Sequence, residues 1–257
     1  LISRSIPVRM ESWSSPSARR LPRFRADNMT GRSDSMTLRL PLLVLLLSLS
    51  LLEAKAEDRK VLVFGDSLSA GYGLQAGEGW VALLAERTQA AGLPVALVNA
   101  SISGETTRGG LRRLSDVLAR QRPDVVILEL GGNDGLRGYP IGQIHSNLNE
   151  MVNIIRATGA EVLLVSIPLP PNYGPRYVRA FQGAFETVAA AEGVRLLTFT
   201  RSLLPLNEDM MQADGIHPTA KAQPLMLDAL WPALAPLLGA SAGNGKPPET
   251  REAATLH

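Results

Sequence analysis

The sequence predicts an α/β fold, a flavodoxin-like three-layer α/β/α sandwich with a five-stranded parallel sheet. Two observations lead to this fold class. Short apolar runs, typical of strands that are buried on both faces, recur along the chain. Longer segments with the three-and-four apolar spacing of amphipathic helices separate them. Strands and helices that alternate in this way form right-handed β-α-β crossovers around a parallel sheet.

The first predicted strand, residues 60–65, reads KVLVFG, a short apolar run that ends in glycine. Similar runs predict the other strands at residues 95–99, 124–130 and 161–167 and, more weakly, at 194–199. Helices are predicted at residues 80–91, 107–121, 141–158, 177–192 and 219–237. Because such folds place ligands outside the carboxyl ends of their strands, we expect the functional residues there.

The segments outside the predicted domain, residues 57–238, have a different composition. Residues 1–35 are rich in Arg and Ser and lack an apolar period, so they resemble translated upstream sequence or a disordered extension. Residues 239–257 are small, polar and Pro-containing, which predicts a disordered tail.

Residues 36–56 have the order of a signal peptide: a positive start, a short apolar run and the triplet Ala54-Lys55-Ala56. Cleavage is expected before Glu57. The alternative is a membrane anchor, but the run of about 13 apolar residues is shorter than the ~20 that a spanning helix needs. We therefore expect a periplasmic or secreted protein without a stable membrane anchor after cleavage.

The excess of basic residues in the whole chain comes from residues 1–56. Residues 1–56 hold nine of the 26 Lys and Arg residues and four of the 24 Asp and Glu residues, so the remainder has 17 basic and 20 acidic residues and a net charge of −3. A nucleic-acid partner is therefore not expected. The absence of cysteine excludes disulfides, cysteine nucleophiles and thiolate metal sites.

Polar motifs lie where the first predicted strand ends and where the last predicted helix begins. Ser67 follows the first strand, and Asp214 and His217 precede the final helix. A hydroxyl nucleophile needs a base near neutral pH, and the other two histidines lie in a predicted helix face and at the chain end. Asp214, three residues before His217 in a Gly-containing turn, is placed to orient the imidazole. Taken singly, Asp214 is equally typical of a helix cap and Ser67 of a turn.

In combination these motifs resemble the SGNH (GDSL) hydrolase family across residues 58–238, which implies the SGNH hydrolase fold. The four blocks of the family occur in order as GDSLS at 65–69, SGET at 103–106, GND at 132–134 and DGIHP at 214–218. Further stretches look like the branch of periplasmic thioesterase I, which is also described as a lysophospholipase and arylesterase.

The resemblance implies a role for each matching residue. It assigns Ser67, Asp214 and His217 to a catalytic triad, and the oxyanion hole to the backbone N–H groups of Ser67 and Gly104 and the side-chain amide of Asn133. Gly104 has no Cβ to obstruct an oxygen that approaches its N–H. The neutral amide of Asn133 donates without a charge that would shift the pKa of a nearby histidine. In isolation, Asn133 is typical of an ordinary turn.

The implied activity is that of a serine esterase or thioesterase, which acts on aryl esters, acyl-CoA-type thioesters or lysophospholipids through an acyl-serine intermediate. No cofactor and no metal site are expected, since Asp66 and Asp134 are more typical of structural hydrogen bonding. The alternatives are a carbohydrate acetylesterase of the same family and a non-catalytic flavodoxin-like module that binds a nucleotide or phosphate.

The loop at residues 168–177 follows the fourth predicted strand and should lie at the same edge of the sheet as Ser67. Its prolines are equally typical of a rigid surface connection. In the branch that the sequence resembles, the matching loop lies along the acyl chain. We therefore expect Leu169 and Tyr173 to bind the acyl chain of a small-molecule ester or thioester.

Overall fold

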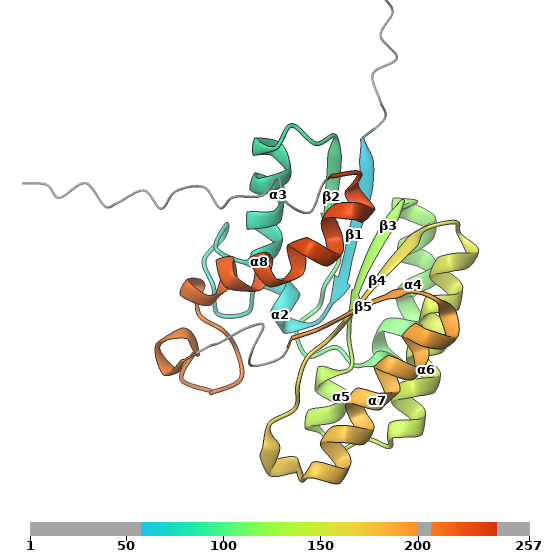
Figure 1. Ribbon diagram of the computed structural model, residues 1–257, viewed down its shortest axis with the longest axis vertical. Coiled ribbons are helices and arrows are strands. Elements are labelled where there is room, and N and C mark those ends of the chain that lie inside the picture. The colour runs from blue at the N-terminus through green and yellow to red at the C-terminus, as the bar shows by residue number, and fades with distance from the viewer. Residues whose placement is uncertain (1–57, 200–206, 241–257) are drawn as a thin grey trace, which may run out of the picture. The chain divides into compact units, whose positions relative to one another are not determined.

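The computed structural model describes residues 58–199 and 207–240 (Figure 1). The predicted extension and signal peptide, together with all but the first two residues of the predicted tail, lie outside the described residues. Within the described part, no helix combines the length and the apolar character that crossing a membrane requires.

Five strands form one parallel sheet, as the sequence predicts, and the structure gives their order as β2-β1-β3-β4-β5. They are β1 (Arg59–Gly65), β2 (Val95–Asn99), β3 (Val125–Glu129), β4 (Glu161–Ser166) and β5 (Arg195–Thr198). The chain runs from β1 to β2 on one side and then crosses to β3 on the other. The direction of winding thus changes between β1 and β3, which is where ligand sites of such folds lie.

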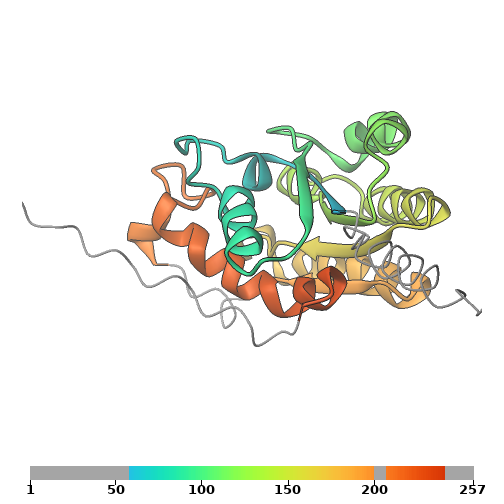
Figure 2. The ribbon, with the colours of Figure 1, turned by 90° about the horizontal axis from the view of Figure 1, so that it is seen from above.

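Helices cover both faces of the sheet (Figures 1 and 2). One face carries α4 (Thr107–Gln121), α6 (Ile141–Ala157) and α7 (Pro175–Glu192), which pack on residues such as Leu62 and Phe64. The other carries α3 (Trp80–Ala90) and α8 (Gln223–Leu234), which lie side by side over Val61 and Val63. Burial on both faces explains why the strands are continuously apolar instead of alternating.

The differences from the predicted elements are local. Two short helices, α2 (Ser67–Ala70) and α5 (Gly132–Leu136), are too short for a periodic signal. Helix α7 begins at Pro175 instead of residue 177, because proline is well suited to the first helical position. The final helix is shorter than the predicted 219–237, since it follows a 3₁₀ turn at Ala220–Ala222 and ends in another at Ala235–Leu238.

Gly110 lets α4 approach the sheet closely. A Cβ at this position would lie 2.4 Å from Leu130 Cδ1 and 3.1 Å from Phe64 Cε1. Only a residue without a side chain fits this contact without displacing the core. The close approach brings the start of α4, and the loop before it, to the carboxyl ends of β1 and β3.

Candidate active site

Ser67 lies at the carboxyl end of β1, where it is the first residue of α2. The Asp66 side chain caps this helix, since its Oδ1 accepts a hydrogen bond from the Leu68 N–H at 3.1 Å. The side chain of Ser67 is half-buried. The short helix therefore fixes the direction of the Ser67 hydroxyl at the edge of the sheet.

His217 and Asp214 come to Ser67 from the loop before α8. The distance from His217 Nε2 to Ser67 Oγ is 2.9 Å, and that from His217 Nδ1 to Asp214 Oδ2 is 2.6 Å. The other carboxylate oxygen of Asp214 accepts from the N–H groups of Ile216 at 2.9 Å and His217 at 3.0 Å. One carboxylate thus closes the turn and orients the ring. It does not cap α8, which begins at Gln223.

The same contacts keep Asp214 ionised. Hydrogen bonds from the His217 N–H, the His217 ring and the Ile216 N–H lower the pKa of Asp214 to about 2. An ionised carboxylate accepts from Nδ1–H and so leaves Nε2 free to accept the proton of a serine hydroxyl. The arrangement is that of a nucleophile, a base and an orienting group.

Gln212 and Tyr72, which the sequence motifs do not indicate, hold the histidine loop in place. The Gln212 N–H donates to the His217 carbonyl at 2.7 Å, and its side-chain amide donates to the Tyr72 carbonyl at 2.8 Å. The rings of Tyr72 and His217 are 4.6 Å apart. The loop is therefore attached to the chain just after Ser67.

Gly104 and Asn133 lie at the ends of the neighbouring strands. Gly104 is exposed, has a φ of +79°, and its N–H has no acceptor among the residues of the two described segments. Asn133, in the first turn of α5, donates one amide hydrogen to Asp66 Oδ2 at 2.9 Å. This leaves its second amide hydrogen for another acceptor.

Two carboxyl groups are buried beneath these residues, at the ends of β1 and β3. Glu129 Oε2 accepts from the Ser69 hydroxyl at 2.7 Å and from the Asp66 N–H at 3.3 Å. Burial raises the pKa of Asp66 to about 6, and burial together with the charge of Asp66 raises the pKa of Glu129 well above its usual range. Glu129 is therefore the group of the pair whose charged form is disfavoured, and the Asp66 carboxylate accepts from the Asn133 amide.

Asp134 has the structural role that the sequence indicates. Its carboxylate accepts from the Thr107 N–H at 2.8 Å and the Thr107 hydroxyl at 2.6 Å, which joins α5 to the start of α4. Among the described residues, no group of three or more His, Cys, Asp or Glu side chains is placed to hold a metal ion.

Leu169 and Tyr173 are placed differently from the expected wall along an acyl chain. Leu169 is only 6% exposed and belongs to the core, where it packs against Gly135 of α5 and Phe181. The half-buried Tyr173 donates its hydroxyl to the Leu136 carbonyl at 2.7 Å. Both side chains therefore support α5, the helix that carries Asn133, and the expectation that Leu169 faces the substrate needs this correction.

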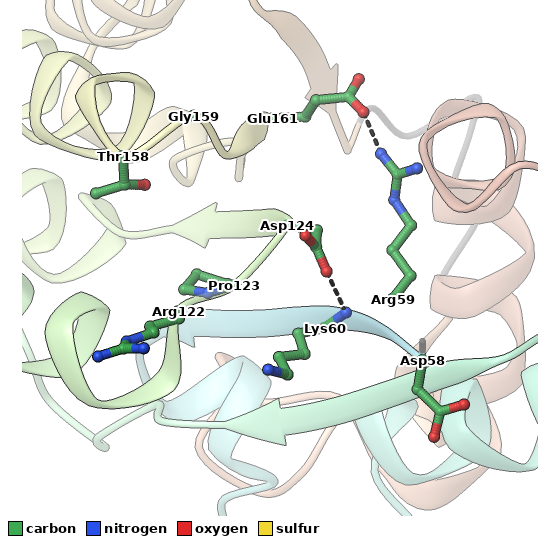
Figure 3. Close-up of a pocket in the computed structure, with 9 residues that line it drawn as sticks. All are labelled: Asp58, Arg59, Lys60, Arg122, Pro123, Asp124, Thr158, Gly159 and Glu161. Carbon is green, nitrogen blue, oxygen red and sulfur yellow. Dashed lines mark hydrogen bonds and ion pairs between the residues drawn. The ribbon is translucent and has the colours of Figure 1, made fainter. Parts of the chain in front are cut away.

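A cavity of about 450 Å³ lies far from these residues, at the amino ends of the strands (Figure 3). Two of its carboxylates have partners within the cavity: Arg59 forms an ion pair with Glu161, and Asp124 accepts from the Lys60 backbone N–H at 2.7 Å. It is on the opposite edge of the sheet from Ser67, and we assign no chemistry to it.

The raised pKa of Asp66 predicts a pH-dependent stability. Because the folded pKa of about 6 exceeds the ordinary 3.8, the stabilisation by protonated Asp66 is complete below about pH 4 and is lost as the pH rises through 6. Asp66→Asn removes the ionisable group and with it this pH-dependent loss of stability. We expect the unfolding free energy of the wild type, relative to the variant, to fall on the order of 2 kcal/mol between pH 4 and 7.

Urea denaturation at four pH values measures this difference. Asp116→Asn, at an exposed carboxylate on α4, is the control and should follow the wild type. Parallel pH curves for wild type and Asp66→Asn would contradict the interpretation.

Known proteins are similar to this chain in sequence and in fold. The profile of the GDSL-like Lipase/Acylhydrolase family matches residues 63–224. Esterase TesA of Pseudomonas aeruginosa is 50% identical over 192 residues, which cover 75% of this chain and 96% of that protein. Thioesterase 1/protease 1/lysophospholipase L1 of Escherichia coli K12 is 43% identical over 194 residues, which cover 76% and 91%.

A solved structure of an esterase is also similar to this chain. The psychrotrophic esterase EstA from Pseudoalteromonas sp., inhibited by monoethylphosphonate, has a TM-score of 0.67 and 42% identity, and the match covers 71% of this chain and all of that one. The family profile spans more than half of the chain, and the four motifs lie within the described SGNH hydrolase fold. The chain therefore belongs to the GDSL-like lipase/acylhydrolase family and is an acylhydrolase.

Proposed function

We propose that the protein hydrolyses acyl esters and thioesters through an acyl-serine intermediate, with Ser67 as nucleophile, His217 as base and Asp214 as orienting group. The observation that carries this proposal is the chain of two hydrogen bonds, 2.9 Å from Ser67 Oγ to His217 Nε2 and 2.6 Å from His217 Nδ1 to Asp214 Oδ2. Inhibition of the relative EstA by a phosphonate is in keeping with a nucleophilic serine.

The reaction has two halves. In the first, Ser67 Oγ attacks the acyl carbonyl carbon while His217 Nε2 takes the hydroxyl proton, and the same proton passes to the departing alcohol or thiol. In the second, His217 takes a proton from water, the resulting hydroxide attacks the acyl-serine, and Ser67 recovers its proton as the acid leaves. Asp214 stays ionised throughout, because its pKa is about 2.

Both halves pass through an oxyanion, and three donors are available for it. The N–H of Ser67 starts a helix and so has no intrahelical partner. The Gly104 N–H and the second amide hydrogen of Asn133 complete the set. Each such donor contributes ~3 kcal/mol to transition-state stabilisation. In this proposal Asp66 positions Asn133, since its carboxylate holds the first amide hydrogen.

Exposed apolar side chains near the triad support an acyl substrate. Four large apolar side chains are exposed in the described residues, and three of them, Tyr72, Ile102 and Ile216, lie within five residues of Ser67, Gly104 or His217. Exposed apolar side chains gathered at one site are typical of a binding surface for an apolar ligand. These three are the acyl contacts in our proposal, in place of Leu169.

We further propose that the enzyme acts after export, in the periplasm or outside the cell, as residues 36–56 indicate. The mass of the exported protein tests this, because cleavage before Glu57 gives a defined N-terminus. An exported form that retains residues 36–56 would contradict the proposal.

A fluorophosphonate probe should label Ser67 and abolish turnover. Phosphonylation needs a serine activated by its base, so the probe mass is expected on the peptide that contains Ser67, by mass spectrometry. Ser67→Ala should remove both the label and the hydrolysis of octanoyl esters while the melting temperature stays near that of the wild type.

The matched control is Ser103→Ala, at an exposed serine of the second motif, which should keep label and activity. Failure of an intact probe to label the wild type would favour the non-catalytic module instead.

Ile102→Ala and Leu169→Ala should affect acyl chains differently. Ile102 is half exposed, so its loss should cost up to ~0.8 kcal/mol for each methylene that lies against it, and the defect in kcat/KM should grow from acetyl to octanoyl esters. Leu169 supports α5, so its truncation should lower the rate by a similar factor for all chain lengths. The reverse pattern would return the acyl-binding role to residues 168–177.

A further inference from the structure

A second cavity, of about 400 Å³, lies next to the candidate oxyanion hole. The residues that line it come from the start of α4, the end of α5 and the start of α6: Thr106, Arg108, Arg112, Arg137, Tyr139 and Gln143. We call it the arginine pocket. Arg108 and Arg112 are one helical turn apart on α4, so their side chains share a face.

A residue that lines the arginine pocket contacts two residues of the candidate oxyanion hole. Arg137 Nη2 donates to the Gly104 carbonyl at 3.2 Å, and the Arg137 N–H donates to the Asn133 carbonyl at 3.2 Å. Thr106, which lines the pocket, is two residues from Gly104. A molecule that occupies the arginine pocket is therefore beside the position of the reacting carbonyl, although not at it.

The arginine pocket concentrates positive charge that the protein does not neutralise. None of its lining residues is acidic, and within the described segments Arg108, Arg112 and Arg137 form no ion pair. By contrast, the next arginine on the helix, Arg113, is paired with Glu105. Residues 57–257 carry a net charge of −3, so three unpaired arginines around one cavity oppose the general charge of the chain.

We propose that the arginine pocket binds a phosphate group of the leaving alcohol or thiol, and that Arg108 and Arg112 are the residues that favour substrates with a phosphorylated leaving group. This inference rests on the proposed function. Guanidinium groups match phosphate oxygens in charge and in their forked hydrogen-bond geometry. Because the pocket lies beside the reacting position, a spacer must separate the phosphate from the acyl carbonyl. A coenzyme A thioester and a lysophospholipid both have this chemistry.

The test compares leaving groups at constant acyl chain. Octanoyl-coenzyme A carries phosphates, whereas S-octanoyl-N-acetylcysteamine is a thioester without them. For Arg108→Gln/Arg112→Gln, kcat/KM on octanoyl-coenzyme A should fall roughly tenfold, mainly through KM, and the neutral thioester should change less than about twofold. Arg120→Gln, at an exposed arginine on the other end of α4, is the matched control and should change neither.

A third substrate, octanoyl lysophosphatidylglycerol below its micelle concentration, distinguishes the sources of the phosphate. A loss on the lipid alone assigns the pocket to a headgroup, a loss on the coenzyme A thioester alone assigns it to that leaving group, and both results support the proposal. An equal loss on the neutral thioester, or no loss on either phosphate substrate, overturns it. So does a variant whose defect appears only in binding to anionic phosphatidylglycerol vesicles, which would make the arginines a membrane contact.

These outcomes are separate from the failure of the proposed function. A wild-type protein that hydrolyses none of the three substrates contradicts the hydrolase mechanism. Wild-type hydrolysis of the neutral thioester with no effect of the double variant on the other two contradicts the arginine pocket alone.

Discussion

The hydrogen bonds around Asp66 connect the candidate catalytic residues to the core. Asp66 sits where β1 becomes α2; it caps the helix that presents Ser67 and accepts from Asn133 on α5. Beneath it, Glu129 accepts hydrogen bonds from the Asp66 N–H and the Ser69 hydroxyl. Two carboxyl groups so close in the interior cannot both be charged without a large cost, and burial together with the charge of Asp66 raises the pKa of Glu129 well above its usual range. The site therefore depends on the buried carboxyl groups of Asp66 and Glu129. Their burial lowers the stability of the fold, but their hydrogen bonds hold α2 and the Asn133 amide in place.

The regular elements were predictable because burial determines their sequence. A parallel strand covered on both faces must be apolar throughout, and helices that cover it must be apolar on one side, so all five strands and the long helices leave a pattern. Helices α2 and α5 have four and five residues and leave none. Asp66 caps the first of them locally, and a tertiary hydrogen bond from the Thr107 N–H to Asp134 holds the second.

Sequence motifs indicate the site residues that lie in recognisable local patterns, such as His217 in the DGIHP block. They do not indicate Glu129, because a single carboxyl group within the predicted strand at residues 124–130 carries no motif, and its burial depends on tertiary packing. Gln212 also escapes notice, since its role lies in two hydrogen bonds to a distant segment. Leu169 was expected at the substrate because the matching loop of the branch that the sequence resembles lies along the acyl chain; its burial against Gly135 depends on packing that no single segment contains.

The two tyrosines that follow β4 connect the segment after this strand to α5 and the residues behind it. Tyr173 binds the carbonyl of Leu136, and Tyr177 binds that of Tyr139 at 2.8 Å, so both hold the residues just after Asn133. A change in this segment that removes either hydroxyl therefore also loosens the residues that follow a donor of the proposed oxyanion hole. Sequence variation between β4 and α7 thus reaches the reaction rate through α5, and a loop exchange at this edge of the sheet has to preserve both tyrosine hydroxyls.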